Sequence, residues 1–164
     1  MNESLLPNIR SYASERQLQI GEPLGSGKDG IVLVGRSKTR PARVAIKALR
    51  FPELYLREKL VYLRLEQMAI NSVLGFNVPE LLDFDDTRRI IEMTIVRRPF
   101  VLDFAGAYLD TRPEFPADIW ADWEAEKREQ FEDRWPTVEK ILAAFERLGI
   151  YLLDLSPGNI GFRD

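Results

Sequence analysis

A glycine-rich stretch followed by strand-like residues constrains this chain more than any other feature. Residues 24–35 read LGSGKDGIVLVG, with glycines at Gly25, Gly27 and Gly30. Without a Cβ atom, such a backbone can take positive φ angles and approach an anion closely. Successive backbone N–H groups in a turn of this kind form a concavity that holds phosphate oxygens. After a turn-rich stretch and a short β-branched run, Lys47 can place a cation against the same phosphates.

Two common phosphate-binding loops do not fit this stretch. A Walker A loop needs a Gly separated by four residues from a Gly-Lys pair and then Ser or Thr, but these positions hold Glu22 and Asp29. A Rossmann fingerprint needs a helix after the glycines. Residues 31–34 read Ile-Val-Leu-Val instead, which is typical of a strand. The loop therefore joins two antiparallel strands, and taken alone it is equally compatible with an ordinary hairpin turn and a surface lysine.

A second motif narrows the choice. Val44–Lys47 reads Val-Ala-Ile-Lys, and residues 25–32 match G-x-G-x-x-G-x-V up to Val32. Together they resemble the nucleotide lobe of the protein kinase-like superfamily. The resemblance implies an α+β fold, with an antiparallel five-stranded N-lobe carrying one helix and a minimal, mostly helical C-lobe. We expect residues 1–164 to form a single domain, with 17–98 as the N-lobe and 99–164 as a truncated C-lobe.

The composition limits the chemistry that is open to the chain. It has 164 residues, a net charge of −3, and neither Cys nor His. Disulfides, thiolate chemistry and Cys or His metal ligands are therefore excluded, and any reaction must use carboxylates, Lys, Arg, Asn, Ser or backbone groups. Kinase-type phosphoryl transfer needs little more than these. No basic surplus, signal peptide or membrane span is visible, so we expect a cytoplasmic protein without nucleic-acid or membrane partners.

The remaining pattern predicts the order of the elements. A loosely held lead-in with a short helix is expected over residues 1–16. The predicted strands are 17–23, 31–36, 43–49, 78–84 and 89–96. The predicted helices are 52–71, a short one over 100–108, 118–135 with a buried aromatic stripe, and 137–148, which Gly149 ends.

The helix predicted at 52–71 offers a partner for Lys47. In the kinase fold this helix carries a Glu that pairs with the strand lysine and aims it at the nucleotide. Glu58 is favoured, because the string Glu58-xxx-Tyr62-x-Arg64-Leu65 is similar to the helix of several atypical small-molecule kinases. Glu66 is the alternative, since its distance from Lys47 is closer to that in ordinary protein kinases. Either residue taken singly is equally well explained as a solvated charge on the helix surface.

The resemblance also implies where ATP would bind. The segment Thr94 to Arg98, with Pro99 fixing its exit, corresponds to the hinge that takes the adenine edge with backbone groups. The residues expected to bind the nucleotide come from the first three strands and the glycine loop: Leu24, Gly25, Ser26, Gly27, Gly30, Val32, Ala45 and Lys47.

A third motif follows the last predicted helix. Residues 154–160 read Asp-Leu-Ser-Pro-Gly-Asn-Ile, which keeps the Asp and Asn of the kinase pattern H-R-D-L-x-x-x-N. The form D-x-x-P-x-N-I resembles aminoglycoside phosphotransferases and related small-molecule kinases as well as protein kinases. By this resemblance Asp154 would orient the acceptor hydroxyl, and Asn159 would bind Mg²⁺ through its amide oxygen. A simple turn capped by the two side chains is the alternative.

The chain departs from the kinase pattern in two places. Leu152 and Leu153 replace the His and Arg of H-R-D, so control through an activation-loop phosphate is not expected. The printed sequence ends at Asp164, before the D-F-G segment whose Asp is a principal Mg²⁺ ligand in these families. Asp164 itself is a poor substitute, because the strand after Asn159 leads away from the phosphates in this fold.

Two functions therefore stay open at this point. The first is an ATP- and Mg²⁺-dependent phosphotransferase, with Lys47, Glu58 and Asp154 as catalytic residues and a protein or small-molecule hydroxyl as acceptor. The second is a pseudokinase that binds nucleotide or acts as a scaffold. The acceptor cannot be derived from the sequence, and a protein partner or a second copy of the chain remains an open expectation in either case.

Overall fold

The computed structural model of the protein describes residues 4–164 and shows an α+β fold. The helices are α1 (Leu6–Glu15), α2 (Pro52–Gln67), α3 (Ala117–Phe131) and α4 (Trp135–Glu146), with the short 3-10 helix η1 (Glu132–Arg134) before α4. The main sheet contains β1 (Leu18–Ser26), β2 (Gly30–Ser37), β3 (Arg43–Leu49), β6 (Leu81–Asp85) and β7 (Ile90–Thr94). The short strands are β4 (Ser72–Val73), β5 (Phe76–Asn77), β8 (Phe100–Val101), β9 (Tyr108–Leu109), β10 (Ile150–Tyr151) and β11 (Ile160–Gly161).

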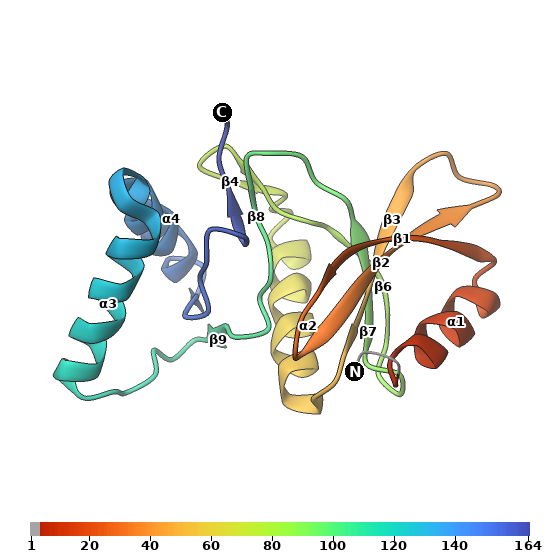
Figure 1. Ribbon diagram of the computed structural model, residues 1–164, viewed down its shortest axis with the longest axis horizontal. Coiled ribbons are helices and arrows are strands. Elements are labelled where there is room, and N and C mark those ends of the chain that lie inside the picture. The colour runs from red at the N-terminus through yellow and green to blue at the C-terminus, as the bar shows by residue number, and fades with distance from the viewer. Residues whose placement is uncertain (1–3) are drawn as a thin grey trace.

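The five strands of the main sheet run in the order β1-β2-β3-β7-β6, and every neighbouring pair is antiparallel. This confirms the predicted five-stranded antiparallel sheet. Helix α2 packs on one face of the sheet and α1 on the other, while α3 and α4 lie beyond α2 (Figure 1). The sheet thus carries a helix on each face, one more than the sequence predicted for it.

Helix α1 corrects the prediction of a loosely held lead-in over residues 1–16. Ile9 and Tyr12 are wholly buried, and they pack with Leu33, Ile46 and Ile90 in a separate core on the far side of the sheet. The apolar residues of α1 recur three and four positions apart, so one helical face can cover the sheet. Residues 1–3 lie outside the part of the chain that the structure describes.

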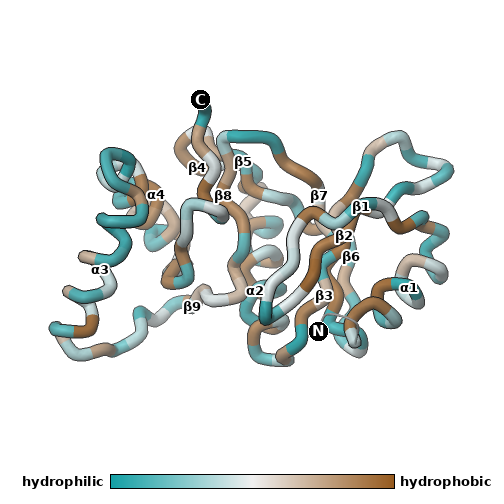
Figure 2. The backbone as a smooth tube through the Cα atoms, in the orientation of Figure 1, coloured by the Kyte–Doolittle hydropathy of each residue, from teal (hydrophilic) through white to brown (hydrophobic). Residues whose placement is uncertain are grey.

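The larger core lies on the α2 side of the sheet and joins the sheet to the C-terminal helices. It contains Tyr62 from α2, Val138 and Phe145 from α4, and Trp135, which begins α4. In Figure 2 the exposed turns of α3 are mostly hydrophilic, whereas α4 carries hydrophobic residues. The aromatic stripe that was predicted to be buried is buried at Phe131 and Trp135. Among the helices of residues 4–164, none is both long and apolar enough to cross a membrane.

Several parts of the secondary structure differ from prediction. The helix predicted over residues 118–135 ends at Phe131 as α3, and Trp135 belongs to α4. The expected helix over residues 100–108 is absent, because Phe100 and Val101 form β8, which pairs with β11 and β5. Asp103 then takes a left-handed conformation, with φ of +67°, that no helix can contain. The expected strand over 78–84 begins later, at Leu81, after the missed hairpin β4–β5.

Candidate active site

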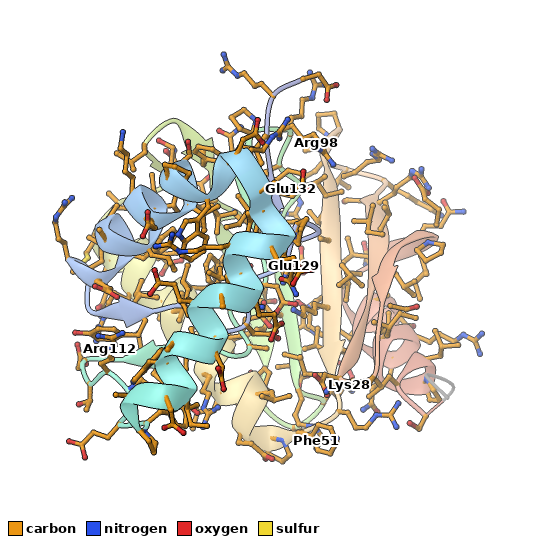
Figure 3. All side chains as sticks on the ribbon, turned by 60° about the vertical axis from the view of Figure 1, so that its left-hand side comes forward. Lys28, Phe51, Arg98, Arg112, Glu129 and Glu132 are labelled. Atoms are coloured by element: carbon orange, nitrogen blue, oxygen red, sulfur yellow. The ribbon has the colours of Figure 1, made fainter. Side chains whose placement is uncertain are left out.

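A cleft of about 550 Å³ lies between the sheet and the C-terminal half of the chain. The residues predicted for the glycine loop, the sheet, the helix partner of Lys47 and the C-terminal motif all line it: Leu24, Gly25, Ser26, Gly27, Gly30, Val32, Ala45, Lys47, Glu58, Asp154 and Asn159. In Figure 3, Lys28 in the glycine loop and Arg98, at the end of the segment that follows β7, lie towards opposite ends of the sheet. Motifs from three distant parts of the chain are thereby brought to one concave surface.

The glycine loop is the tight connection between β1 and β2. Gly27 donates its N–H to the carbonyl of Gly30 at 3.0 Å, which closes the turn. A Cβ atom at Gly30 would lie 2.5 Å from the Ala48 carbonyl, so any side chain there would collide with β3. Gly25 and Gly27 face open space, and none of the three glycines has the positive φ that the sequence suggested. The absence of side chains at Gly25 and Gly27 instead leaves the space above the cleft open.

Lys47 and Glu58 form a buried ion pair at the back of the cleft. Strand β3 places the lysine Nζ 2.8 Å and 2.9 Å from the two carboxylate oxygens of Glu58 on α2. Lys47 is 9% exposed and Glu58 is fully buried. Glu66, the alternative partner, is exposed on the same helix and does not line the cleft. The register of β3 against α2 therefore selects Glu58.

Burial and charge act in opposite directions on this pair. Burial by itself would lower the pKa of Lys47, but the carboxylates of Glu58 and Asp103 outweigh it, so the net shift is upward and the lysine stays charged. Burial raises the pKa of Glu58, and the nearby Lys47 offsets only part of that rise. The pair thus holds a cation at the back of a partly apolar cleft.

The segment after β7 forms one end of the cleft. Thr94, Ile95 and Val96 line it, whereas Arg97 and Arg98, the rest of the segment predicted to bind the adenine edge, do not. The carbonyl of Arg97 accepts a hydrogen bond from the Asn77 side chain at 2.9 Å. The peptide bond between Arg98 and Pro99 is cis.

Apolar side chains line both walls of the cleft near this segment. Val32 and Ala45 belong to the sheet, and Leu102 and Ala105 come from the opposite wall. A flat ring that enters from this end would be covered on both faces, which is the usual arrangement of a largely apolar ligand site with a few polar groups.

The motif of residues 154–160 folds as a turn held by its own backbone. Asn159 donates its N–H to the Ser156 carbonyl at 2.9 Å and its side-chain amide to the Asp154 carbonyl at 3.4 Å. The Asn159 carbonyl in turn accepts the N–H of Leu102 at 2.7 Å. Asp154 is exposed to the cleft, so its carboxylate is accessible to a ligand.

Helix α3 fixes this loop from behind, which the sequence did not predict. Trp123 donates its indole N–H to the Leu153 carbonyl at 3.1 Å, and the Lys127 amine donates to the Leu155 carbonyl at 2.7 Å. These carbonyls flank Asp154 on both sides. Lys127 is only 7% exposed, and the one sequence signal for its role is a lysine four residues after a tryptophan in an aromatic helix.

Asp103 is a cleft residue that the sequence analysis missed. Its carboxylate lies 3.2 Å from the Lys47 amine, and its side chain lines the cleft. It lies in the segment 100–108, which the sequence predicted to be a helix and did not assign to the site. Asp164 does not line the cleft.

Comparison with known proteins adds no assignment. Neither the protein-family models nor the curated proteins contain a match to this sequence. Among residues 4–164, no three or more Asp and Glu side chains form a group that could hold a metal ion. The function must therefore be argued from the geometry of the cleft.

Proposed function

We propose that this chain is a kinase-like protein that binds Mg-ATP and transfers its γ-phosphoryl group to a hydroxyl acceptor. One observation carries the proposal: Lys47 from the sheet and the pair Asp154 and Asn159 from the C-terminal half line the same cleft. If the short motifs matched the kinase pattern by chance, there would be no physical reason for their residues to line the same cleft of about 550 Å³. The sheet topology, with the glycine loop above the cleft, supports the same proposal.

The residues suggest a division of roles. The apolar walls at Val32, Ala45 and Leu102 would cover the adenine, and the glycine loop would cover the phosphates. Lys47, held by Glu58, would bind phosphate oxygens. Transfer breaks the bond between the γ-phosphorus and its bridging oxygen and forms one to the acceptor oxygen, whose proton passes to Asp154 and then to solvent. Such catalysis consists of positioning and charge stabilisation.

Asn159 and the carboxylates of the cleft are oxygen ligands of the kind that Mg²⁺ prefers. When bound, the metal ion would neutralise charge on the phosphates that are transferred and released.

Thermal unfolding with and without Mg-ATP tests the proposal. At a nucleotide concentration one hundred times the Kd, one-site binding adds about 2.7 kcal/mol to the free energy of unfolding. Lys47→Met should abolish that gain, while the matched control Lys38→Met, in the exposed turn before β3, should keep it. No stabilisation of the wild-type protein, or equal stabilisation of Lys47→Met, would contradict the nucleotide site.

Turnover separates the two functions that the sequence left open. ATP consumption that depends on a hydroxyl acceptor and is lost in Asp154→Asn supports the phosphotransferase. Stabilisation by ATP without turnover over a broad set of protein and small-molecule acceptors would identify a pseudokinase.

A further inference from the structure

Asp103 presents a partly free carboxylate to the cleft. Its backbone φ of +67° lies in the left-handed region, which Asp and Asn enter more readily than other residues with a side chain. The Oδ1 atom accepts the N–H of Ala105 at 3.3 Å and lies 3.2 Å from the Lys47 amine. Both bonds end on Oδ1 and neither uses Oδ2, and 36% of the side chain is exposed. One oxygen thus fixes the carboxylate while the other remains available.

The segment around Asp103 is anchored firmly on both sides. Phe104 is fully buried and makes an edge contact with Tyr62 of α2, and it also packs against Phe145 of α4. A Cβ atom at Gly106 would lie 2.6 Å from the Cβ atom of Asp154, so this close approach requires glycine. Together with the bond between Leu102 and Asn159, these contacts hold Asp103 beside the catalytic loop.

The charge of the cleft calls for a cation. Two lysines, Lys28 and Lys47, line it, against the four carboxylates of Asp29, Glu58, Asp103 and Asp154. A triphosphate would meet a surplus of negative charge there unless a divalent cation accompanied it. Mg²⁺ in nucleotide sites commonly uses one or two carboxylates and completes its shell with phosphate oxygens and water. The lack of a three-carboxylate cluster within residues 4–164 is compatible with such a site.

We propose that Asp103 and Asn159 together hold the Mg²⁺ ion of Mg-ATP. The donor atoms fit: Oδ2 of Asp103 is available, and Asn159 uses its amide nitrogen toward Asp154, which leaves its amide oxygen for the metal. The metal-binding carboxylate therefore precedes the catalytic loop along the chain. This inference rests on the proposed function.

Calorimetric titration of ATP, with Mg²⁺ present and with the metal chelated, tests the assignment on the full chain. Asp103→Asn keeps the shape, the left-handed backbone and the acceptor for Ala105, and removes only the charge. If Asp103 binds the metal, the Kd for ATP in Mg²⁺ should rise at least tenfold in Asp103→Asn. If it acts only as a repelling charge, the same Kd should fall or stay unchanged, which would overturn the proposal.

Two further measurements complete the test. Asp164→Asn makes the same charge change outside the cleft and should leave the Kd in Mg²⁺ within twofold of wild type; a tenfold rise in this variant would assign the metal to Asp164 instead. A wild-type protein that binds no ATP, with or without metal, would overturn the nucleotide site itself, which distinguishes that failure from a failure of Asp103 alone.

The wild-type chain supplies an independent readout if Asp103→Asn does not fold. With Fe²⁺ as the probe metal, ADP, ascorbate and peroxide, oxidative cleavage of the backbone should be mapped by mass spectrometry. Cuts near both Asp103 and Asn159 support the shared site. Cuts confined to residues 159–164 would contradict it.

Discussion

The two walls of the cleft hold their polar groups in different ways. On the sheet side, Lys47 and Glu58 belong to a regular strand and helix and are joined directly by a buried ion pair. On the opposite wall, Asp154 and Asn159 are in a loop, and Asp154 is exposed. Their position depends on backbone carbonyls that α3 and the segment 102–106 hold from outside. The sheet side is thus fixed by a direct side-chain pair, and the loop by its own turn together with contacts from neighbouring segments.

This difference has a physical reason. A buried charge is tolerated only when a partner compensates it, so the lysine and its glutamate must be placed together. Under the proposed function the Asp154 carboxylate would stay open to the acceptor, so the loop is held through the backbone carbonyls that flank this carboxylate. Substitutions on each side of the cleft should distinguish the direct ion pair of the sheet side from the backbone contacts that hold the loop.

The largest effect is expected from breaking the buried ion pair. Lys47→Met leaves Glu58 buried without its partner and should lower the free energy of unfolding by about 3–5 kcal/mol. Chemical denaturation measures this loss. The double variant Lys47→Met with Glu58→Leu should regain most of the stability but no ATP binding. A single variant as stable as wild type would show that the pair does not stabilise the sheet side.

An intermediate effect is expected from releasing the loop. Lys127→Met removes the donor to the Leu155 carbonyl and should cost about 1–3 kcal/mol of stability. Because Lys127 does not line the cleft, the Kd for ATP should stay within twofold while acceptor-dependent turnover falls at least tenfold. Lys140→Met, on the exposed side of α4, is the control. Equal losses of binding and turnover would mean that α3 supports the whole cleft rather than the loop.

A smaller effect is expected on the far face of the sheet. Tyr12 donates its hydroxyl to the buried carboxylate of Glu92 at 2.7 Å, so Tyr12→Phe should lower the free energy of unfolding by about 1–2 kcal/mol. Denaturation of the variant, followed by ATP titration, checks both parts of the expectation. Since α1 and α2 lie on opposite faces of the sheet (Figure 1), and α2 supplies Glu58 to the cleft, nucleotide affinity should not change. A clear change in affinity would show that the two faces are coupled through β7.

The smallest effect is expected from acid. Partial burial works against ionisation of Asp83, but the hydrogen bond from Arg16 prevails and lowers the pKa of this carboxyl below 3.8. A lowered pKa contributes stability above the unfolded value that is lost as the pH falls through the folded value. The free energy of unfolding should therefore decline below about pH 4, and Asp83→Asn should flatten the decline. An identical pH profile for the variant would exclude this contribution.

Much of the sheet side could be predicted from the sequence because its signals are local. The glycine loop, the β-branched runs and the helix that begins at Pro52 are each recorded in consecutive residues. Glu58 could be favoured over Glu66 by a short string, but only the contact between β3 and α2 shows the pairing. The sequence predicted a loosely held segment where α1 lies. The helix is held by the packing of its apolar face on a sheet that distant residues build, and this packing cannot be seen in the local pattern.

The opposite wall was less predictable because long-range contacts build it. Residues 100–108 have an apolar composition that fits a helix, yet Phe100 and Val101 form a strand that pairs with β11 and β5 in a small sheet. That pairing turns Asp103 toward Lys47, far away in the sequence. The hydrogen bonds that Trp123 and Lys127 donate to the loop backbone depend in the same way on where α3 packs.

The sequence by itself specified the residue types of the cleft: a glycine-rich loop, a lysine after a strand, and an acid and an amide five positions apart in a turn. Periodicity and turn chemistry act over a few residues, so these features survive without any knowledge of the fold. Only the tertiary structure decided which glutamate meets the lysine and which aspartate joins them. Those choices depend on strand pairing and helix packing between segments that are distant in the chain.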